Sequence, residues 1–295
     1  MFELKGCFTA LPTPFRNDRV DEDSLRKIIR FQIENGVSGL LPCGSTGEAA
    51  TLGAEEYERV IKIAVEEAKG KLPVMAGTGT NSTSRSVAMA KKTAALGVDA
   101  LLVIVPYYNK PTQDGQFAHF SEVSGAVDIP VIVYNIPGRT GVNMLPSTLI
   151  RLRKKCRNIV GVKEASGNMD QVGEILNSTD GEFSLMSGDD SLTLPMMSLG
   201  ARGVVSVISN VAPAETAKMC ALFAAGKLKE AAEMHHKLLP LMKALFVETN
   251  PAPVKSALAM MGLCGETPRL PLVPVSEKIK EILKSAMLKA EIKFP

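Results

Sequence analysis

Length, composition and charge place this chain among ordinary globular proteins. It has 295 residues, of which 45% are hydrophobic and 22% are charged, a balance that excludes a disordered chain. The net charge is only +3, and no run of lysine and arginine with interleaved aromatics occurs, so a nucleic-acid-binding role is not supported. Five scattered cysteines without CxxC spacing argue against a disulfide framework and a zinc site, and indicate a reducing compartment.

The sequence offers no targeting or membrane segment. The start, MFELKGCFTALPTPF, has an apolar patch that Lys5, Pro12 and Pro14 interrupt, so it is too short and too broken for a signal peptide. No later run reaches the roughly 20 apolar residues that a membrane span requires. We therefore expect a cytoplasmic protein without a membrane partner.

Apolar runs alternate with amphipathic stretches along most of the chain, a pattern typical of strands that alternate with helices. Gly36, Gly70 and Gly97 end three of the predicted helices, and proline opens two others. In chain order, the predicted units are GCFTAL with residues 21–35, VSGLLPC with 54–69, LPVMAG with a helix from about Ser82, DALLVIVP with 114–126, IPVIVYNIP with a helix opened by Pro146, NIVGVKEAS with 169–177, EFSLMSG with 191–199, and GARGVVSVISN with a helix opened by Pro213.

Strands that are apolar on both faces belong in a parallel sheet covered by helices. Eight such units in series predict an α/β fold, a TIM (β/α)8 barrel over residues 1–225, with an open doubly wound sheet as the alternative. Beyond Gly226 the strand pattern ends, and residues 227–246, 251–261 and 276–288 are predicted to be helical. Residues 226–295 are therefore expected to form a C-terminal helical extension, packed on the barrel or on another subunit.

Lys163 lies at the end of the apolar strand in IVGVKEASG. A lysine at the edge of an apolar layer either finds a carboxylate or has its pKa lowered by desolvation. Glu164 is adjacent, but neighbouring side chains on a strand point to opposite faces, so the two cannot easily pair. The alternatives are a structural lysine and an amine kept partly neutral for attack on a carbonyl.

The other predicted strand ends carry small and polar residues, and in a barrel these ends share one rim. GSTGE, residues 44–48, offers hydroxyls and backbone N–H groups that could hold a carboxylate, although such turns are often only turns. GTGTN lacks the third glycine of a dinucleotide loop, because Ser82 stands there. SGDD makes a poor metal cage, and Asp189 or Asp190 is expected to cap a helix instead.

Three of the four tyrosines, Tyr107, Tyr108 and Tyr134, fall on the same predicted rim. They could be amphipathic edges of the core, or phenols that relay protons for a Schiff-base lysine. Arg139 could bind a substrate carboxylate through two hydrogen bonds, or pair with an acid of the fold. The three histidines are predicted to be structural or exposed, and no metal site is predicted.

The motifs GSTGE, YYN, YNIPGRTG, GVKEASG and SGDD, in this order over essentially the whole chain, resemble those of the dihydrodipicolinate synthase/N-acetylneuraminate lyase superfamily of pyruvate-using aldolase barrels. PGRTG with Arg139, and the paired tyrosines of PYYNKP, are most similar to the dihydrodipicolinate synthase branch. The resemblance implies a lyase that condenses pyruvate with L-aspartate 4-semialdehyde on the diaminopimelate route to lysine. It also implies a homotetramer built as a dimer of dimers, and a reaction without metal or other cofactor.

The resemblance also implies roles for individual residues. Lys163 would form the Schiff base with pyruvate, and Tyr134 would donate and accept protons through Ser45 and a Tyr108 supplied by a neighbouring subunit. The remaining matches are binding positions: Ser45 and Thr46 for the pyruvate carboxylate, Arg139 for the carboxylate of the semialdehyde, Gly188 and Val205 for the pocket wall, and Asn81 and Tyr107 for an allosteric lysine pocket.

Two departures from the family pattern have expected consequences. Ser45 replaces the usual threonine, so the hydroxyl is kept but the methyl group that stiffens it is lost. Ala54 and Arg85 stand where lysine-inhibited members have a histidine and a glutamate. Because an arginine should repel the ammonium groups of lysine, we expect weak or absent feedback inhibition.

Two other functions remain open from the sequence. One is a neighbouring aldolase acting on a sugar acid or on hydroxy-oxoglutarate, which would need smaller hydrogen-bonding residues at position 139. The other is a catalytically silent barrel that binds metabolites, which would form no adduct with pyruvate.

Overall fold

The computed structural model describes residues 2–294, which divide into two compact units. The first unit comprises residues 2–5 and 75–205, and the second comprises residues 6–74 and 206–294. The predicted division into a (β/α)8 barrel catalytic domain, 1–225, and a C-terminal helical extension, 226–295, stays a prediction.

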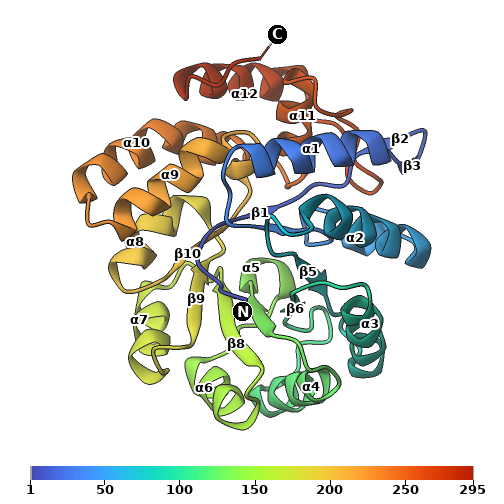
Figure 1. Cartoon of the computed structure of the whole chain (residues 1–295), viewed down its shortest axis with the longest axis vertical. Helices are drawn as coiled ribbons and strands as arrows, with labels where there is room; N and C mark the ends of the chain where they lie inside the picture. Colours follow the sequence, from blue (N-terminus) through green and yellow to red (C-terminus); the bar gives the residue numbers. More distant parts are fainter. Residues whose placement is uncertain (1, 295) are drawn as a thin grey trace. The chain divides into compact units, whose positions relative to one another are not determined.

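The first unit contains five consecutive parallel strands and the start of a sixth. These strands are rich in apolar residues and are buried. In the strand Val131–Asn135, for example, every residue is buried, as the run VIVYN predicts. Helices α3, α4, α6 and α7 lie outside these strands (Figure 1). The strands are β5 (Met75–Thr78), β6 (Ala100–Ile104), β7 (Val131–Asn135), β8 (Ile159–Glu164), β9 (Ser184–Ser187) and β10 (Gly203–Ser206), which crosses the boundary between the units.

The pairing of β7 with β8 contains a bulge. Val131 pairs with Ile159, but Ile132 pairs with Gly161, so the register skips Val160. Beyond the bulge, Tyr134 lies opposite Lys163 and Asn135 lies opposite Glu164. The bulge therefore decides which side chain of β8 lies beside Tyr134.

Helices of the first unit begin at the signals that the sequence contains. Thr112 and Asn168 accept hydrogen bonds from backbone N–H groups of the helices that follow them, and Pro146 occupies a first turn. The helix predicted over 191–199 is instead a 3₁₀ turn followed by a short α-helix. The helical elements are α3 (Thr83–Ala95), α4 (Gln113–Gly125), α5 (Pro137–Thr140), α6 (Pro146–Lys155), α7 (Met169–Ser178), η2 (Asp190–Leu192) and α8 (Thr193–Ser198).

The second unit contains two parallel strands and a small hairpin that the sequence analysis did not predict. In the hairpin, Asn17 and Asp18 have φ of 52° and 58°, as the tight turns that join antiparallel strands require. Leu40 also forms a bridge with Val74, just before β5. The strands are β1 (Gly6–Ala10), β2 (Phe15–Arg16), β3 (Arg19–Val20) and β4 (Gly39–Leu41).

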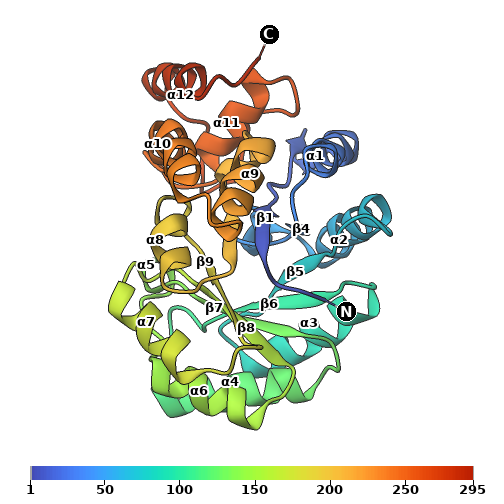
Figure 2. The same ribbon diagram turned by 60° about the vertical axis from the view of Figure 1, so that its left-hand side comes forward.

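Helices dominate the rest of the second unit, including the three predicted after residue 226. Asp21 caps the first helix through Ser24, and Pro213 opens α9 as predicted. Helix α10 packs against α9 and α12 (Figure 2). The helical elements are α1 (Glu22–Glu34), η1 (Ala49–Thr51), α2 (Ala54–Ala68), η3 (Ile208–Asn210), α9 (Pro213–Ala224), α10 (Leu228–Ala244), α11 (Ala252–Met260) and α12 (Glu277–Lys289).

Eight strands form one parallel sheet in the order β4-β1-β10-β9-β8-β7-β6-β5. Read from its far end, this order runs from β5 to β10 and continues with β1 and β4, which is the chain order taken as a cycle. Each of these strands is followed by helical structure, so the predicted (β/α)8 barrel is confirmed. Between residues 2 and 294, no helix combines the length and apolar character needed to cross a bilayer.

Candidate active site

Lys163 is a buried residue on β8 and is only 5% exposed. Tyr134 lies opposite it on β7, and residues in register on adjacent strands point to the same face. The Lys163 Nζ lies 4.3 Å from the centre of the Tyr134 ring. The structure thus brings the predicted nucleophile and the predicted proton-transfer residue together.

Burial lowers the pKa of Lys163 from 10.5 to about 7. The Asp190 carboxylate opposes this effect by favouring the ammonium, while the Arg139 guanidinium strengthens it. An amine with a pKa near neutrality is present in large part as the neutral nucleophile. Lys163 therefore has the electrostatic state that Schiff-base formation needs.

Glu164 makes its hydrogen bonds away from this amine, as the alternation of strand residues predicts. Glu164 is 1% exposed, and its carboxylate accepts hydrogen bonds from Asn135 Nδ2 at 3.0 Å, Gln171 Nε2 at 3.1 Å and the backbone N–H of Ser166 at 2.7 Å. Donors of this kind satisfy a buried carboxylate without a cation. The positive charge of Lys163 is thus not needed to neutralise Glu164.

The same polar cluster holds the segment that carries Arg139. Asn135 precedes this segment and Asn143 follows it, and Asn135 Nδ2 donates to Asn143 Oδ1 at 2.7 Å. Asn143 Nδ2 in turn donates to Gln171 Oε1 at 2.8 Å, and Asn135 Oδ1 accepts from the N–H of Met144 at 3.0 Å. These bonds fix both ends of the loop that bears Arg139, whose side chain is exposed.

The sequence pattern did not identify Asn135, Asn143 and Gln171 as members of the site. One signal was available, because Asn135 and Glu164 are polar residues at the ends of otherwise apolar strands. Their pairing depends on the register of β7 against β8, which the sequence pattern does not give.

Gly188 lies against Lys163. Its N–H donates to the carbonyl of Glu164 at 2.7 Å, and a Cβ atom at position 188 would lie 3.2 Å from Lys163 Cε and 2.7 Å from Ala165 Cβ. Val205, another predicted wall residue, is buried on β10, where Val204 pairs with Ser187. Gly188 is therefore positioned to set how closely the backbone approaches the lysine.

The Gly188→Ala substitution should lower kcat/KM for the keto acid by about 10²-fold, because displacing a reacting group by about 1 Å has an effect of this size. The added methyl must push either Ala165 or the Lys163 side chain away. Steady-state kinetics with a melting curve check this prediction. Gly173→Ala is a matched control, since a Cβ there meets no atom within 4 Å; equal kinetics for the two variants would contradict it.

The two aspartates of the SGDD motif interact with different groups. Asp189 accepts a hydrogen bond from the N–H of Ser191 at 2.8 Å and so caps η2, as predicted. Asp190 is buried and is the acid whose charge acts on Lys163, a role that the sequence analysis did not predict. Among the described residues, no cluster of three or more histidine, cysteine and acidic side chains could hold a metal ion.

The GSTGE motif lies in the second unit, so its geometry is described by itself. Ser45 is half-buried and its carbonyl accepts a hydrogen bond from the N–H of Glu48 at 3.2 Å. Thr46 is buried, and its Oγ1 accepts a hydrogen bond from Asn250 Nδ2 at 2.9 Å. The predicted carboxylate-binding hydroxyls therefore belong to an ordered turn.

The paired tyrosines of the first unit are exposed. Tyr108 is 87% exposed and has φ of +70°, a left-handed conformation that is unusual for a bulky residue, and Tyr107 is 36% exposed. Asn81 is half-buried, and its carbonyl accepts a hydrogen bond from Asn109. Tyr108 thus does not act as a core edge residue within its own chain.

The chain is similar to known proteins over nearly its whole length. The model of the dihydrodipicolinate synthetase family matches residues 3–290. The 4-hydroxy-tetrahydrodipicolinate synthase of Syntrophus aciditrophicus is 51% identical over 284 residues, which cover 96% of this chain and 97% of that protein.

Solved structures also match the chain over nearly its whole length. The dihydrodipicolinate synthase of Aquifex aeolicus has a TM-score of 0.97 and 45% identity, with 99% of both chains covered. The Acinetobacter baumannii dihydrodipicolinate synthase complexed with pyruvate has a TM-score of 0.96 and 40% identity, with 99% of this chain and 100% of that chain covered. On the evidence of the buried Lys163–Tyr134 pair, the barrel and these similarities, the chain belongs to the dihydrodipicolinate synthetase family.

Proposed function

We propose that this chain is a 4-hydroxy-tetrahydrodipicolinate synthase, a lyase that condenses pyruvate with L-aspartate 4-semialdehyde. The observation that carries the proposal is the buried Lys163 amine, whose pKa is lowered to about 7 next to Tyr134. Curated relatives with 51% and 49% sequence identity to this chain bear this enzyme's name, and one solved relative is complexed with pyruvate.

In the proposed reaction, the neutral Lys163 amine attacks the ketone carbon of pyruvate and water leaves to give a Schiff base. Loss of a methyl proton gives an enamine, which adds to the aldehyde carbon of the second substrate. The amino group of that substrate then attacks the former ketone carbon, which closes the ring and releases Lys163. The iminium acts as the electron sink, so the proposed chemistry uses no metal and no other cofactor.

Tyr134 is proposed to give and take the protons of these steps, with Ser45 and the Tyr108 of a neighbouring copy continuing the relay. Its ring beside Lys163 supports the first role, and the exposure of Tyr108 supports the second. Homotetramer formation from two dimers is proposed on the same ground, because a bulky exposed phenol in a left-handed conformation suits a contact with another subunit.

Substrate recognition is proposed to use one carboxylate-binding group for each substrate. Ser45 and Thr46 take the pyruvate carboxylate through their hydroxyls and turn amides, and Arg139 takes the carboxylate of the semialdehyde. Gly188 and Val205 line the pocket, and the approach of Gly188 to Lys163 supports that assignment.

A coupled assay tests the proposed function. The chain is given pyruvate with aspartate semialdehyde, and separately with sugar aldehydes or with the aldehyde partner of a hydroxy-oxoglutarate aldolase. Turnover that is much faster with aspartate semialdehyde supports the proposal. Faster turnover with another aldehyde supports a neighbouring aldolase, and absence of any pyruvate adduct after borohydride reduction supports a silent barrel.

Schiff-base formation should depend on pH through the amine of Lys163. Below its lowered pKa the group is a charged ammonium and cannot attack, and above that pKa it is neutral, so the rate rises as pH increases through about 7 and then levels off. Trapping rates with pyruvate and borohydride at low pyruvate concentration measure this. A rate that keeps rising toward the ordinary lysine pKa of 10.5 would contradict the prediction.

Lysine is proposed to inhibit weakly or not at all. Arg85 is exposed on α3 and Ala54 is exposed at the start of α2, at the positions where a glutamate and a histidine are expected in an inhibited member. Activity measured against increasing lysine should stay nearly flat. Arg85→Glu should increase sensitivity relative to an Arg151→Glu control on α6, and half-inhibition of the unmodified chain at micromolar lysine would overturn this proposal.

A further inference from the structure

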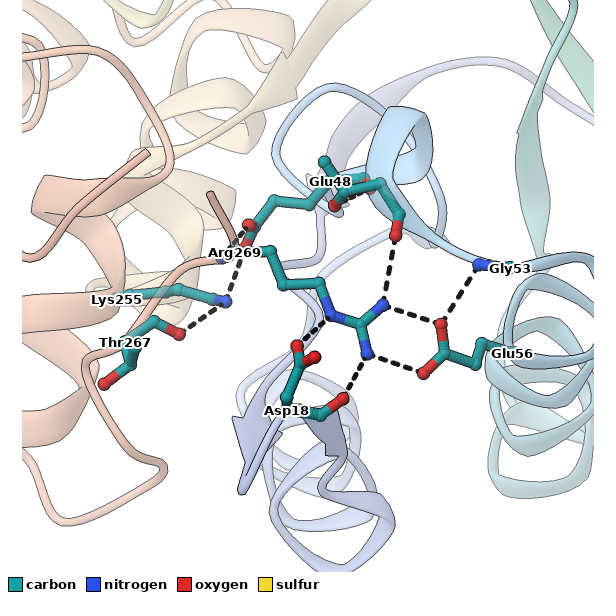
Figure 3. Close-up of polar contacts among 8 residues, drawn as sticks. Asp18, Glu48, Gly53, Glu56, Lys255, Thr267 and Arg269 are labelled. Atoms are coloured by element: carbon teal, nitrogen blue, oxygen red, sulfur yellow. Dashed lines mark hydrogen bonds and ion pairs between the residues drawn. The ribbon is translucent and has the colours of Figure 1, made fainter. Parts of the chain in front are cut away.

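A buried group of charges in the second unit contains no residue to which the function proposed above assigns a role. Lys255 on α11 is fully buried and forms an ion pair with Glu48, which is 5% exposed (Figure 3). Lys255 Nζ also donates to the carbonyl of Thr267 at 3.2 Å, and the N–H of Arg269 donates to Glu48 Oε2 at 2.8 Å. Both Glu48 oxygens are therefore held by residues 255–269.

Two cations of this group, Lys255 and Arg269, contact the same aromatic ring. Lys255 Nζ and the Arg269 guanidinium each lie 4.2 Å from the centre of the Phe15 ring. The Arg269 guanidinium also donates hydrogen bonds to Glu56 Oε2 at 2.6 Å and to Asp18 Oδ1 at 2.9 Å (Figure 3). Burial lowers the pKa of Lys255, while the Glu48 carboxylate opposes the shift and favours the charged amine. Because burying an ion pair often gives no net stability, the arrangement calls for another explanation.

Glu48 is the last residue of GSTGE, and the backbone of this turn is strained. Cys43 and Glu48 have φ of 55° and 53°, in the left-handed region that residues other than glycine rarely adopt. A Cβ on Gly47 would lie 2.9 Å from the backbone N of Cys43. Such a conformation persists only where surrounding contacts hold it, and the ion pair of Glu48 is one of these contacts.

A second contact from the same part of the chain reaches Thr46 directly. Asn250 Nδ2 donates to Thr46 Oγ1 at 2.9 Å, and both groups are buried. Because the hydroxyl oxygen accepts this bond, the proton of Thr46 is directed elsewhere and can be donated to another acceptor. The side chains of residues 250 and 255 thus act on the two ends of the segment Thr46–Gly47–Glu48.

We propose that Glu48 is a positioning residue which, together with Lys255 and Asn250, makes the C-terminal helices hold the GSTGE turn ready to receive the carboxylate of the keto acid. The inference rests on the proposed function, because it assumes that Ser45 and Thr46 bind that carboxylate. Glu48 contacts no reacting atom, and its effect passes through the shape of the turn.

The test uses the full chain with Glu48→Gln combined with Lys255→Met, which removes both charges and leaves no lone charge buried. KM for pyruvate should rise at least tenfold, while kcat falls by less than threefold and the pH profile of borohydride trapping stays unchanged. Glu56→Gln is the matched control, because it removes the negative charge of the Glu56–Arg269 ion pair and leaves the contacts of Glu48 in place. Its KM should equal that of the unmodified chain.

Asn250→Ala gives a second measurement that leaves the buried charges intact, and it serves if the double variant does not fold. It should raise KM for pyruvate in the same way, since it removes the donor to Thr46. A KM equal to that of Glu56→Gln in both variants would overturn the inference alone. Failure of the unmodified chain to form any pyruvate adduct would overturn the proposed function and, with it, the inference.

Discussion

Replacing Lys163 with arginine should abolish the pyruvate adduct and reduce turnover by about 10⁴-fold or more, the range expected when a covalent nucleophile is removed. Arginine keeps a cation on β8 but stays protonated at all relevant pH values, so it cannot attack a carbonyl. Borohydride reduction in the presence of pyruvate, followed by peptide mass analysis, measures the adduct, and the coupled assay measures turnover.

The chain contains its own control for this experiment. Lys255 is also a buried lysine with a lowered pKa, but it is paired with Glu48, which favours the unreactive ammonium. The adduct of the unmodified chain should map to Lys163 and not to Lys255. An adduct that persists in Lys163→Arg, on Lys255 or on any other lysine, would contradict the assignment of the nucleophile.

Tyr134→Phe should reduce kcat by about 10²- to 10⁴-fold, the usual contribution of general acid–base catalysis. The phenyl ring preserves the packing 4.3 Å from Lys163 Nζ, so the substitution removes only the hydroxyl. Single-turnover kinetics can separate the steps. Slow formation of the Schiff base is expected, with little change in the final extent of trapping.

Tyr57→Phe on α2 is the matched control, because Tyr57 is also buried but belongs to no part of the proposed site. It should leave kcat nearly unchanged. If Tyr134→Phe and Tyr57→Phe had equal kcat, the phenol at position 134 would not be a proton-transfer group, and its ring would serve only to pack against the lysine.

The sequence predicted the order and type of the main elements because their signals are local. Apolar runs bounded by turns became the eight parallel strands, and the expected helix over residues 227–246 became α10, Leu228–Ala244. Pro146, Pro213 and the glycines after helices marked boundaries for reasons of backbone geometry alone. The hairpin around Asn17 was missed because its strands are only two residues long.

Features that depend on register could not be predicted in this way. The placement of Lys163 beside Tyr134 requires the bulge at Val160, and the hydrogen bonds of Glu164 require Asn135 to lie opposite it. The charge of Asp190 acts on Lys163 from a different strand end. Contacts between residues far apart in the chain were equally hidden, as the pair of Glu48 with Lys255 illustrates.

The bulge at Val160 makes the chemistry depend on a residue that takes no part in it. Side chains on a strand alternate between faces, so a regular ladder that included Val160 would move every later residue of β8 by one place and to the other face. Val162 would then lie opposite Tyr134, and Lys163 would lie opposite Asn135. Deleting Val160 would remove the bulge and leave Lys163 opposite Tyr134, because the ladder already skips that residue. The same sequence without its bulge would thus form a barrel with its reactive and inert faces exchanged.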